Sequence, residues 1–382
     1  MRMALDLARA ALGTTSPNPA VGCVIVRDGR IVGKGATAAG GRPHAETIAL
    51  ARAHGRARNA TAYVSFEPCA HQGKTPPCAR ALIEAGISRV VAGCIDPYPA
   101  VRGRGIAMIR RAGVRVTVGV LEDECIRLNE GFIARVKRGR PFVTLKLAAS
   151  LDGRIAAPGG DSRWISSAPA RALVHRWRAE ADAVMVGADT VIADNPRLTC
   201  RRSGKHDRMR DPIRVVIDGK LRVSPHAKVF HPGSGAPAIL VTTERNLARA
   251  RRRYRIARTE VIAAPSAADG VALDDEIALD QLMREFGGRG WCNVLIEGGA
   301  HLAGAALRAG IVDRIALFIA PMILGAGLPA IEGLQIGQTR KIGQVRNALR
   351  LQNLSACRVG ADWLLEGHVQ HKHYSGMKPP RR

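Results

Sequence analysis

Aromatic side chains and long apolar runs are scarce in this sequence. Phenylalanine, tryptophan and tyrosine make up 4% of the 382 residues, too few for the stacking platforms of single-strand nucleic-acid binders. No run of about eighteen apolar residues occurs, and the first residues lack a basic stretch followed by an apolar core, so we expect neither a membrane span nor a signal peptide. Eight cysteines without a short repeating pattern predict no disulfide framework and fit a reducing cytoplasm.

Acidic residues are also few, since 58 basic residues stand against 32 acidic ones and the net charge is +26. Such a positive charge is typical of a protein that binds nucleic acid or an anionic substrate, or of a protein encoded by a genome that favours arginine. The basic residues are spread along the whole chain, which favours the last two, so we expect no nucleic-acid partner. The densest basic run, residues 249–258, is interpreted as a solvated helix face. The length and a hydrophobic content of 46% predict two globular domains.

The most informative motif is His44-Ala45-Glu46, followed by Pro68-Cys69 and then Cys78. One imidazole and two thiolates leave the fourth position of a tetrahedral zinc open for water, which is typical of a catalytic site. Zinc deaminases combine such ligands with a glutamate that moves protons and does not bind the metal, the role predicted here for Glu46. The alternative interpretation is that no metal binds here, that His44 is a hydrogen-bonded polar residue, and that Cys69 and Cys78 are ordinary buried thiols.

The first part of the chain alternates between helical and strand patterns, which predicts an α/β fold with a mixed sheet covered by helices. Both candidate ligand clusters are expected where helices begin, and there the helix dipole lowers the pKa of a thiol. The expected helices are residues 3–12, 44–54, 78–85 and 105–112, and the expected strands are residues 22–26, 31–35, 61–66, 90–94 and 114–118.

A charged helical stretch at residues 121–140 ends in a basic hinge, so we place the domains at residues 1–140 and 141–370. Residues 201–211 are expected to form a mobile basic loop, and residues 371–382 a basic disordered tail. In the second domain we expect strands at residues 142–148, 183–187, 213–217, 238–241, 293–296 and 315–319, with helices at residues 168–179 and 301–309.

Two segments of the second domain could bind ligands. Glu297-Gly298-Gly299 joins a buried strand to a helix, where bare amides can hold phosphate, although a glycine pair can equally close a tight turn. Residues 187–198 are predicted to form a polar loop at the carboxyl end of a strand, where ligands gather in α/β folds. Asp194 there could equally serve as a cap or turn residue, and Lys146 could simply be exposed.

Over nearly its whole length the chain resembles the RibD family of bifunctional riboflavin-biosynthesis proteins, in which a pyrimidine deaminase is fused to a pyrimidine reductase. The Thr75-Pro76-Pro77-Cys78 insert is telling, because tRNA adenosine and cytidine deaminases space their cysteines more closely. The matching motifs are Ser16-Pro17-Asn18-Pro19, Pro43-His44-Ala45-Glu46, Glu67-Pro68-Cys69, Gly73-Lys74-Thr75-Pro76-Pro77-Cys78, Lys146-Leu147-Ala148-Ala149-Ser150-Leu151-Asp152-Gly153-Arg154 and Glu297-Gly298-Gly299.

For the first domain the resemblance implies a cytidine-deaminase-like three-layer fold and hydrolytic deamination of a diaminopyrimidinone that carries a ribosylamino 5′-phosphate. Zinc would bind His44, Cys69 and Cys78, and Glu46 would carry the proton. Asn18 would hold the pyrimidine ring, and His71 or Lys74 the phosphate.

For the second domain the resemblance implies a dihydrofolate-reductase-like fold that reduces the ribosyl group to ribityl with NADPH. Lys146 and Asp194 would assist proton transfer, and the methyl group of Ala148 replaces a frequent glycine that lies against the cofactor. The implied cofactor-binding residues are Ala148, Trp164, Thr190, Asp194, Gly219, Gly299, Ala300, His301, Leu302, Ala303, Gly304 and Ala305, and the implied substrate-binding residues are Lys146, Ser162, Arg178, Leu198, Arg201 and Glu297.

The resemblance also implies a cytoplasmic enzyme and is compatible with a homo-oligomer. Two rival hypotheses remain at this point. One is a nucleic-acid deaminase with a basic accessory domain, against which the cysteine spacing and the motifs of the second domain argue. The other is a non-catalytic zinc-stabilised scaffold in which Glu46 would be incidental.

Overall fold

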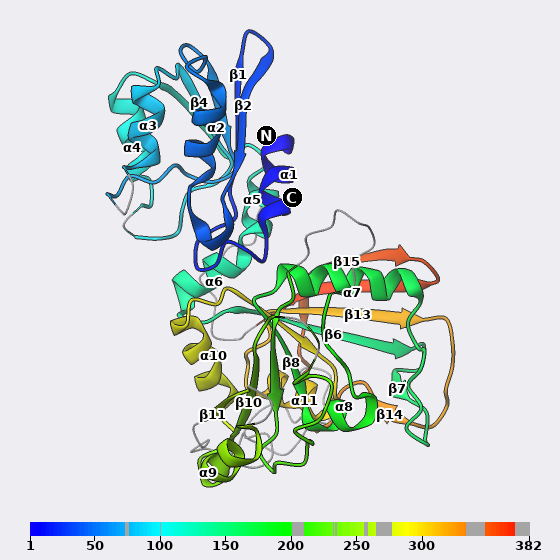
Figure 1. The fold of residues 1–382 in the computed structure, drawn as a ribbon. Coiled ribbons are helices and arrows are strands. Elements are labelled where there is room, and N and C mark those ends of the chain that lie inside the picture. The colour runs from blue at the N-terminus through cyan, green and yellow to red at the C-terminus, as the bar shows by residue number, and fades with distance from the viewer. Residues whose placement is uncertain are drawn as a thin grey trace. The chain divides into compact units, whose positions relative to one another are not determined.

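The computed structural model describes residues 1–72, 76–99, 101–200, 210–231, 233, 235–255, 259–264, 277–333 and 348–370. The chain divides into two compact units, one of residues 1–140 and another that begins at Pro141 (Figure 1). No helix among the described residues is both long and apolar enough to cross a membrane.

The first unit is built on a five-stranded sheet with the order β2-β1-β3-β4-β5. Strand β1 is antiparallel to β2 and β3, whereas β3, β4 and β5 are parallel. Its strands are β1 (Gly22–Arg27), β2 (Arg30–Ala36), β3 (Thr61–Val64), β4 (Arg89–Ala92) and β5 (Arg115–Val118), and its helices are α1 (Arg2–Ala11), α2 (Ala45–Ala53), α3 (Cys78–Glu84), α4 (Arg104–Arg111), α5 (Glu122–Leu128) and α6 (Glu130–Arg138).

Glycines let two helices lie directly on this sheet. A Cβ atom on Gly22 would meet the Ala4 carbonyl oxygen of α1 at 1.8 Å, and one on Gly35 would meet the Ala45 carbonyl oxygen of α2 at 2.4 Å. Gly35 pairs with Cys23, the neighbour of Gly22, so the two glycines face opposite sides of the sheet. Helices α1 and α2 therefore form the outer layers of a three-layer unit, and α2 places His44 at its own amino end.

The second unit contains a nine-stranded sheet with the order β11-β10-β9-β8-β12-β6-β13-β16-β15. Its strands are parallel from β11 to β13, and the β15–β16 hairpin adds two antiparallel ones. The elements are β6 (Phe142–Ser150), β7 (Arg154–Ala156), α7 (Ala168–Glu180), β8 (Ala183–Gly187), α8 (Ala188–Asp194), β9 (Ile213–Ile217), β10 (Ala238–Thr243), α9 (Glu244–Arg253), β11 (Glu260–Ala264), α10 (Leu279–Gly288), β12 (Asn293–Glu297), α11 (Ala300–Arg308), β13 (Arg314–Ala320), β14 (Leu328–Pro329), β15 (Leu351–Val359) and β16 (Asp362–Val369).

Helices cover both faces of this larger sheet. Val143, Leu145 and Leu147 of β6 join one core with α10 and α11. On the other face Ala148 packs with α7 and Phe318, and Figure 1 shows α7 lying along β13 and β6. Because successive residues of a strand face opposite sides, Lys146 lies on the α7 face and away from the main core.

One of the element predictions is wrong in detail. Residues 188–194 form helix α8 where a polar loop was expected, and Asn195 ends that helix in the left-handed conformation. The charged stretch at residues 121–140 is helical as predicted, and Asn129 divides it into α5 and α6. The Asn129 side chain accepts a hydrogen bond from the Ala20 amide and donates one to the Ala20 carbonyl.

The other predicted elements are present with ends that shift by a few residues. Helix α9 carries an exposed basic face as expected for residues 249–253. Residues 256–258, most of the predicted mobile loop at 201–211 and the predicted tail at 371–382 lie outside the described residues.

Candidate active sites

The three predicted metal ligands converge in the first unit. His44 precedes α2, Cys69 follows β3, and Cys78 is the first residue of α3. The Nδ1 atom of His44 lies 3.2 Å from Cys78 Sγ and 3.7 Å from Cys69 Sγ, and all three ligand atoms lie within 4.8 Å of one another. Usual zinc bond lengths and tetrahedral angles require a nitrogen–sulfur separation of about 3.6 Å, so the cluster fits zinc.

The local electrostatics favour a cation among these groups. The hydrogen bond between the two cysteines is the main cause that lowers the pKa of Cys69, to about 4. The same hydrogen bond, followed by burial, raises the pKa of Cys78. The two thiols thus share a proton in the absence of metal. Zinc binds the thiolate form of both cysteines, so the metal would take the place of that proton.

Glu46 lies in the first turn of α2 and is 3% exposed. Burial is the largest cause that raises its pKa, to about 7, and the negative charge of Cys69 acts in the same direction. A carboxyl group that ionises near neutrality can both accept and return a proton, which is the property a general acid–base requires.

A cavity of about 370 Å³ opens beside this cluster. Asn18 and His71 line it, as does Glu46, whereas Lys74 lies outside the described residues. Asn18 donates a hydrogen bond to the Gly41 carbonyl at 3.2 Å. Gly41 has a positive φ of 81° and its Cβ would lie 2.0 Å from the Asn18 amide nitrogen, so only glycine leaves room for Asn18.

Several other side chains of this cavity carry no functional signal in the sequence. Arg42 and Phe66 lie next to the predicted ligands His44 and Cys69, but neither belongs to a ligand pattern. The rest come from segments far from these ligands in the sequence. The missed lining residues include Arg42, Phe66, Asp96, Tyr98, Val101, Phe132 and Arg135.

In the second unit a buried ionic group lies at the carboxyl ends of β6 and β12. Lys146 and Glu297 are directly paired residues of these parallel strands. The guanidinium of Arg178, on α7, donates two hydrogen bonds to the Glu297 carboxylate, at 2.5 Å and 2.8 Å, and the two side chains are 15% and 9% exposed. This bidentate pair with a neighbouring amine is a strong charged cluster.

The cluster shifts the ionisation of its members. Burial lowers the pKa of Lys146, although the Glu297 carboxylate opposes this. Burial alone would raise the pKa of Glu297, but Arg178 and then Lys146 outweigh it and the pKa is lowered. At neutral pH the carboxylate is therefore ionised and paired, and Lys146 is not the exposed side chain that was considered as an alternative.

Glu297 is expected to make the stability of the second unit depend on pH. Because its folded pKa is lowered, its contribution is complete above its ordinary pKa of about 4.3 and is lost as the pH falls through the folded value. Denaturant unfolding of the chain and its Glu297→Gln variant should show a stability difference at pH 7 that shrinks toward pH 3. A difference that stays constant over this range would contradict the lowered pKa.

The predicted cofactor residues gather at the same edge of the sheet. Helix α11 begins at Gly299 without a side-chain cap, so its first amides are available to phosphate oxygens. Gly299 has a positive φ of 83°, and its Cβ would lie 2.9 Å from the Thr190 hydroxyl, so this turn requires glycine. Leu302, Ala303, Gly304 and Ala305 are buried within α11, and the Ala303 amide donates to the Gly299 carbonyl, so a ligand would meet the residues before them first.

The remaining predicted residues are more dispersed. The Ser162 hydroxyl donates to the Asp194 carboxylate at 3.2 Å, and Gly219 follows the carboxyl end of β9. Trp164 is 65% exposed under the Arg171 guanidinium, while Leu198 is buried. Ala148 packs against α7, His301 pairs with Glu332 at 3.3 Å, Ala300 opens α11, and Arg201 lies outside the described residues.

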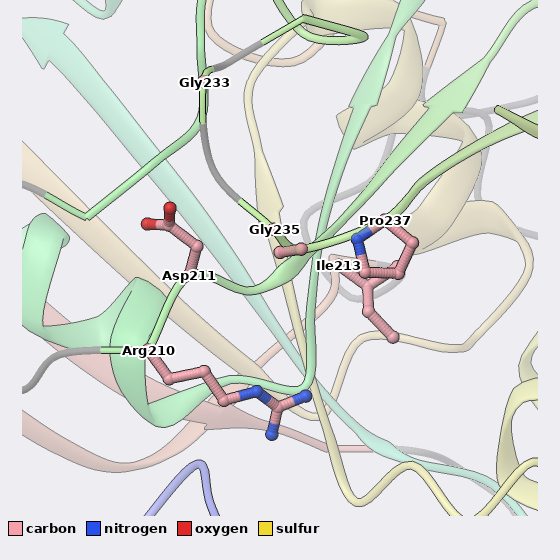
Figure 2. A pocket seen from close by; sticks show the side chains of 7 residues that line it. Arg210, Asp211, Ile213, Gly233, Gly235 and Pro237 are labelled. Atoms are coloured by element: carbon pink, nitrogen blue, oxygen red, sulfur yellow. The ribbon is translucent and has the colours of Figure 1, made fainter. Parts of the chain in front are cut away.

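A second cavity, of about 610 Å³, lies at the opposite ends of the strands (Figure 2). It is lined by Arg210, Asp211, Ile213, Gly233, Gly235, Ala236 and Pro237, at the amino ends of β9 and β10. None of the predicted site residues lines it.

Comparison with known families decides between the hypotheses. Residues 1–94 match the cytidine and deoxycytidylate deaminase zinc-binding region, and residues 141–365 match the RibD C-terminal domain. The RibD of Haemophilus influenzae is 42% identical over 334 residues, covering 85% of this chain and 86% of that protein. The chain belongs to the RibD family. The RibD of Escherichia coli is similar as well, 41% identical over 91% of this chain and 95% of its own.

Solved RibD structures support the same architecture. That of Acinetobacter baumannii RibD has a TM-score of 0.82 and is 34% identical over 97% of this chain and 98% of its own. A deaminase/reductase from Thermotoga maritima has a TM-score of 0.81 and is 35% identical over 97% of both chains. The predicted fold classes, cytidine-deaminase-like and then dihydrofolate-reductase-like, are confirmed.

As a RibD protein, the chain is a bifunctional deaminase and reductase of riboflavin biosynthesis. Zinc and NADPH are its cofactors, as the resemblance implied. The scaffold hypothesis and the nucleic-acid deaminase hypothesis are therefore set aside.

Proposed function

We propose that residues 1–140 deaminate 2,5-diamino-6-ribosylamino-4(3H)-pyrimidinone 5′-phosphate and that residues 141–370 then reduce its ribosyl group, giving 5-amino-6-ribitylamino-uracil 5′-phosphate. The name of the Thermotoga maritima relative describes a deaminase and a reductase for phosphoribosylamino pyrimidines of this kind. The observation that carries the first step is the buried Glu46 in one cavity with the His44 and Cys69 ligands.

In the proposed deamination, His44, Cys69 and Cys78 would hold zinc, which would supply a water whose pKa is lowered toward neutrality. Glu46 would carry the first proton of that water to the ring nitrogen, where it stays, and the second proton, from the resulting hydroxyl group, to the departing amine. The water oxygen thereby replaces the amino group and ammonia leaves. Asn18 orients the ring by its amide, and His71 with Lys74 holds the phosphate.

In the proposed reduction, NADPH bound at the start of α11 supplies the hydride. We assign its contacts to Ala148, Trp164, Thr190, Asp194, Gly219 and residues 299–305. Arg178 and Glu297 hold the substrate together with Ser162, Leu198 and Arg201, because planar guanidinium groups suit phosphate oxygens. Lys146, beside Glu297 in the sheet, and Asp194, within reach of Ser162, are the groups proposed to move protons during ring opening.

We further propose that the enzyme acts in the cytoplasm on this small phosphorylated substrate, without nucleic-acid or membrane partners, and that it forms a homo-oligomer. Its eight cysteines support the reducing compartment, since all are free thiols in the structure. Neither the proposed deamination nor the proposed reduction requires a macromolecular partner.

A coupled assay with and without zinc tests the function. Zinc-loaded protein given the diaminopyrimidinone phosphate should release ammonia and then oxidise NADPH. Chelating the zinc should abolish ammonia release, while reduction of the separately supplied deaminated intermediate should continue, because the reductase residues lie in the other unit. Ammonia release without NADPH oxidation would contradict the reductase assignment, and the absence of both signals would contradict the substrate.

A further inference from the structure

Glu67, two residues before the Cys69 ligand, lines the deaminase cavity with a buried carboxylate and is not a member of the candidate metal cluster. It is 4% exposed. Each of its oxygens accepts two backbone amide hydrogen bonds. Oε2 accepts from Asp96 at 3.2 Å and Gly103 at 2.8 Å, and Oε1 accepts from Gly105 at 3.0 Å and Ile106 at 3.2 Å. Burying a carboxylate is costly unless its oxygens are hydrogen bonded, and these four bonds meet that need.

All four donors belong to one segment, of which residues 96–99 and 101–106 are described, and it runs from the end of β4 into the first turn of α4. Helix α4 begins after Gly103, which has no side chain to cap it, and Glu67 accepts from the amides of its first turn instead. The backbone approach is also close, because a Cβ on Gly105 would lie 1.8 Å from the Pro68 carbonyl oxygen. The segment is therefore held against the Glu67-Pro68 backbone by both charge and shape.

The same segment supplies part of the wall of the deaminase cavity. Asp96, Tyr98 and Val101 all line it. The Tyr98 ring meets the His71 ring edge to face, with centroids 6.3 Å apart, and the Asp96 carboxylate accepts a hydrogen bond from the Tyr98 amide at 2.7 Å. Glu67 thus links the position of this wall to the backbone that carries Cys69.

We propose that Glu67 is a positioning residue of the deaminase, holding Asp96, Tyr98 and Val101 at the distance from the zinc ligands that the substrate requires. This inference rests on the proposed deaminase function of the first unit. The zinc ligands and Glu46 come from other elements, so releasing the segment alters how the substrate is held and leaves the proton-transfer group in place.

Glu67→Gln tests the proposal, because the amide keeps the shape but presents only one acceptor oxygen to four donors. We expect KM for the diaminopyrimidinone phosphate to rise about 10- to 100-fold, the scale of effect of a misplaced contact, with kcat much less affected. Hydrogen exchange should quicken at the amides of residues 96–106. Zinc content and reduction of the deaminated intermediate should stay as in the unmodified chain.

Glu84→Gln is the matched control, since Glu84 lies in the same unit on α3 and is largely exposed beside Arg80. Glu67→Asp retains the charge with a shorter reach and should give an intermediate KM. In Gly105→Ala the added methyl group would clash with the Pro68 carbonyl oxygen and push the segment away from Glu67. This variant keeps the Glu67 carboxylate and should still raise KM.

An unchanged KM in zinc-loaded Glu67→Gln or Gly105→Ala would overturn the proposal. So would variants whose only defect is lost zinc or a lower melting temperature, because that pattern indicates a structural role alone. Failure of the deaminase function itself would appear separately, as no ammonia release from the unmodified chain.

Discussion

Replacing Glu46 by glutamine is expected to reduce deamination by about 10²- to 10⁴-fold, the usual contribution of a positioned general acid–base. The amide is nearly isosteric with the carboxyl group but cannot accept and return a proton. Because His44, Cys69 and Cys78 supply the metal ligands, zinc should remain bound. Reduction of the deaminated intermediate should be unaffected, since its residues lie in the second unit.

The decisive measurements are ammonia release and zinc content of the same purified protein. Glu84→Gln again serves as the control for the chemical change, because it alters an exposed carboxylate of the same unit. If Glu46→Gln loses its zinc, Glu46 is part of the metal site and not the proton carrier. If it deaminates at the normal rate, another group moves the proton.

Arg178→Met is expected to destabilise the second unit by about 3–5 kcal/mol, the cost of removing one partner of a buried ion pair. The Glu297 side chain, 9% exposed in the native structure, would lose its bidentate partner and keep only Lys146 and His175 as nearby basic groups. Reduction should also be lost, because the proposed substrate contacts are removed. Calorimetry can identify the unfolding transition of this unit as the one that NADPH raises.

Two further variants distinguish the effect of breaking the buried ion pair on stability from the effect of removing any arginine. Arg284→Met breaks the exposed pair with Asp280 on α10, whose side chains are 70% and 45% exposed, and should cost less than about 1 kcal/mol. In the double variant Arg178→Met with Glu297→Gln, part of the lost stability should return, because the buried carboxylate is removed together with its partner and Lys146, whose pKa burial already lowers, can stay neutral. A double variant as unstable as Arg178→Met would show that packing, not charge, dominates.

The zinc cluster is the feature that the sequence specified best. His44 and Glu46 are two residues apart, and both cysteines are marked by prolines or a helix start, so ligand types and the spare carboxylate could be read locally. The structure brings the three ligand atoms within 4.8 Å of one another, as a single metal requires. The roles of the individual residues remain proposals for the experiments above.

The wall of the deaminase cavity could not be read in this way. Asp96 and Tyr98 look like ordinary turn residues, and Glu67 looks like an exposed acid before a proline. Their importance comes from hydrogen bonds that join residues 29 to 39 positions apart. Likewise, the polar run at residues 188–194 gave no strong apolar period, and packing against β8 and β9 makes it helix α8.

By itself, then, the sequence predicted what depends on local spacing: a candidate metal cluster of His44, Cys69 and Cys78 with a spare carboxylate at Glu46, and the two α/β fold classes. Only the tertiary structure decided which distant groups share a site. It paired Lys146 with Glu297 through the strand register and brought Arg178 to them from α7. The physical reason is that strand pairing and helix packing depend on the whole sheet, whereas ligand spacing within one turn does not.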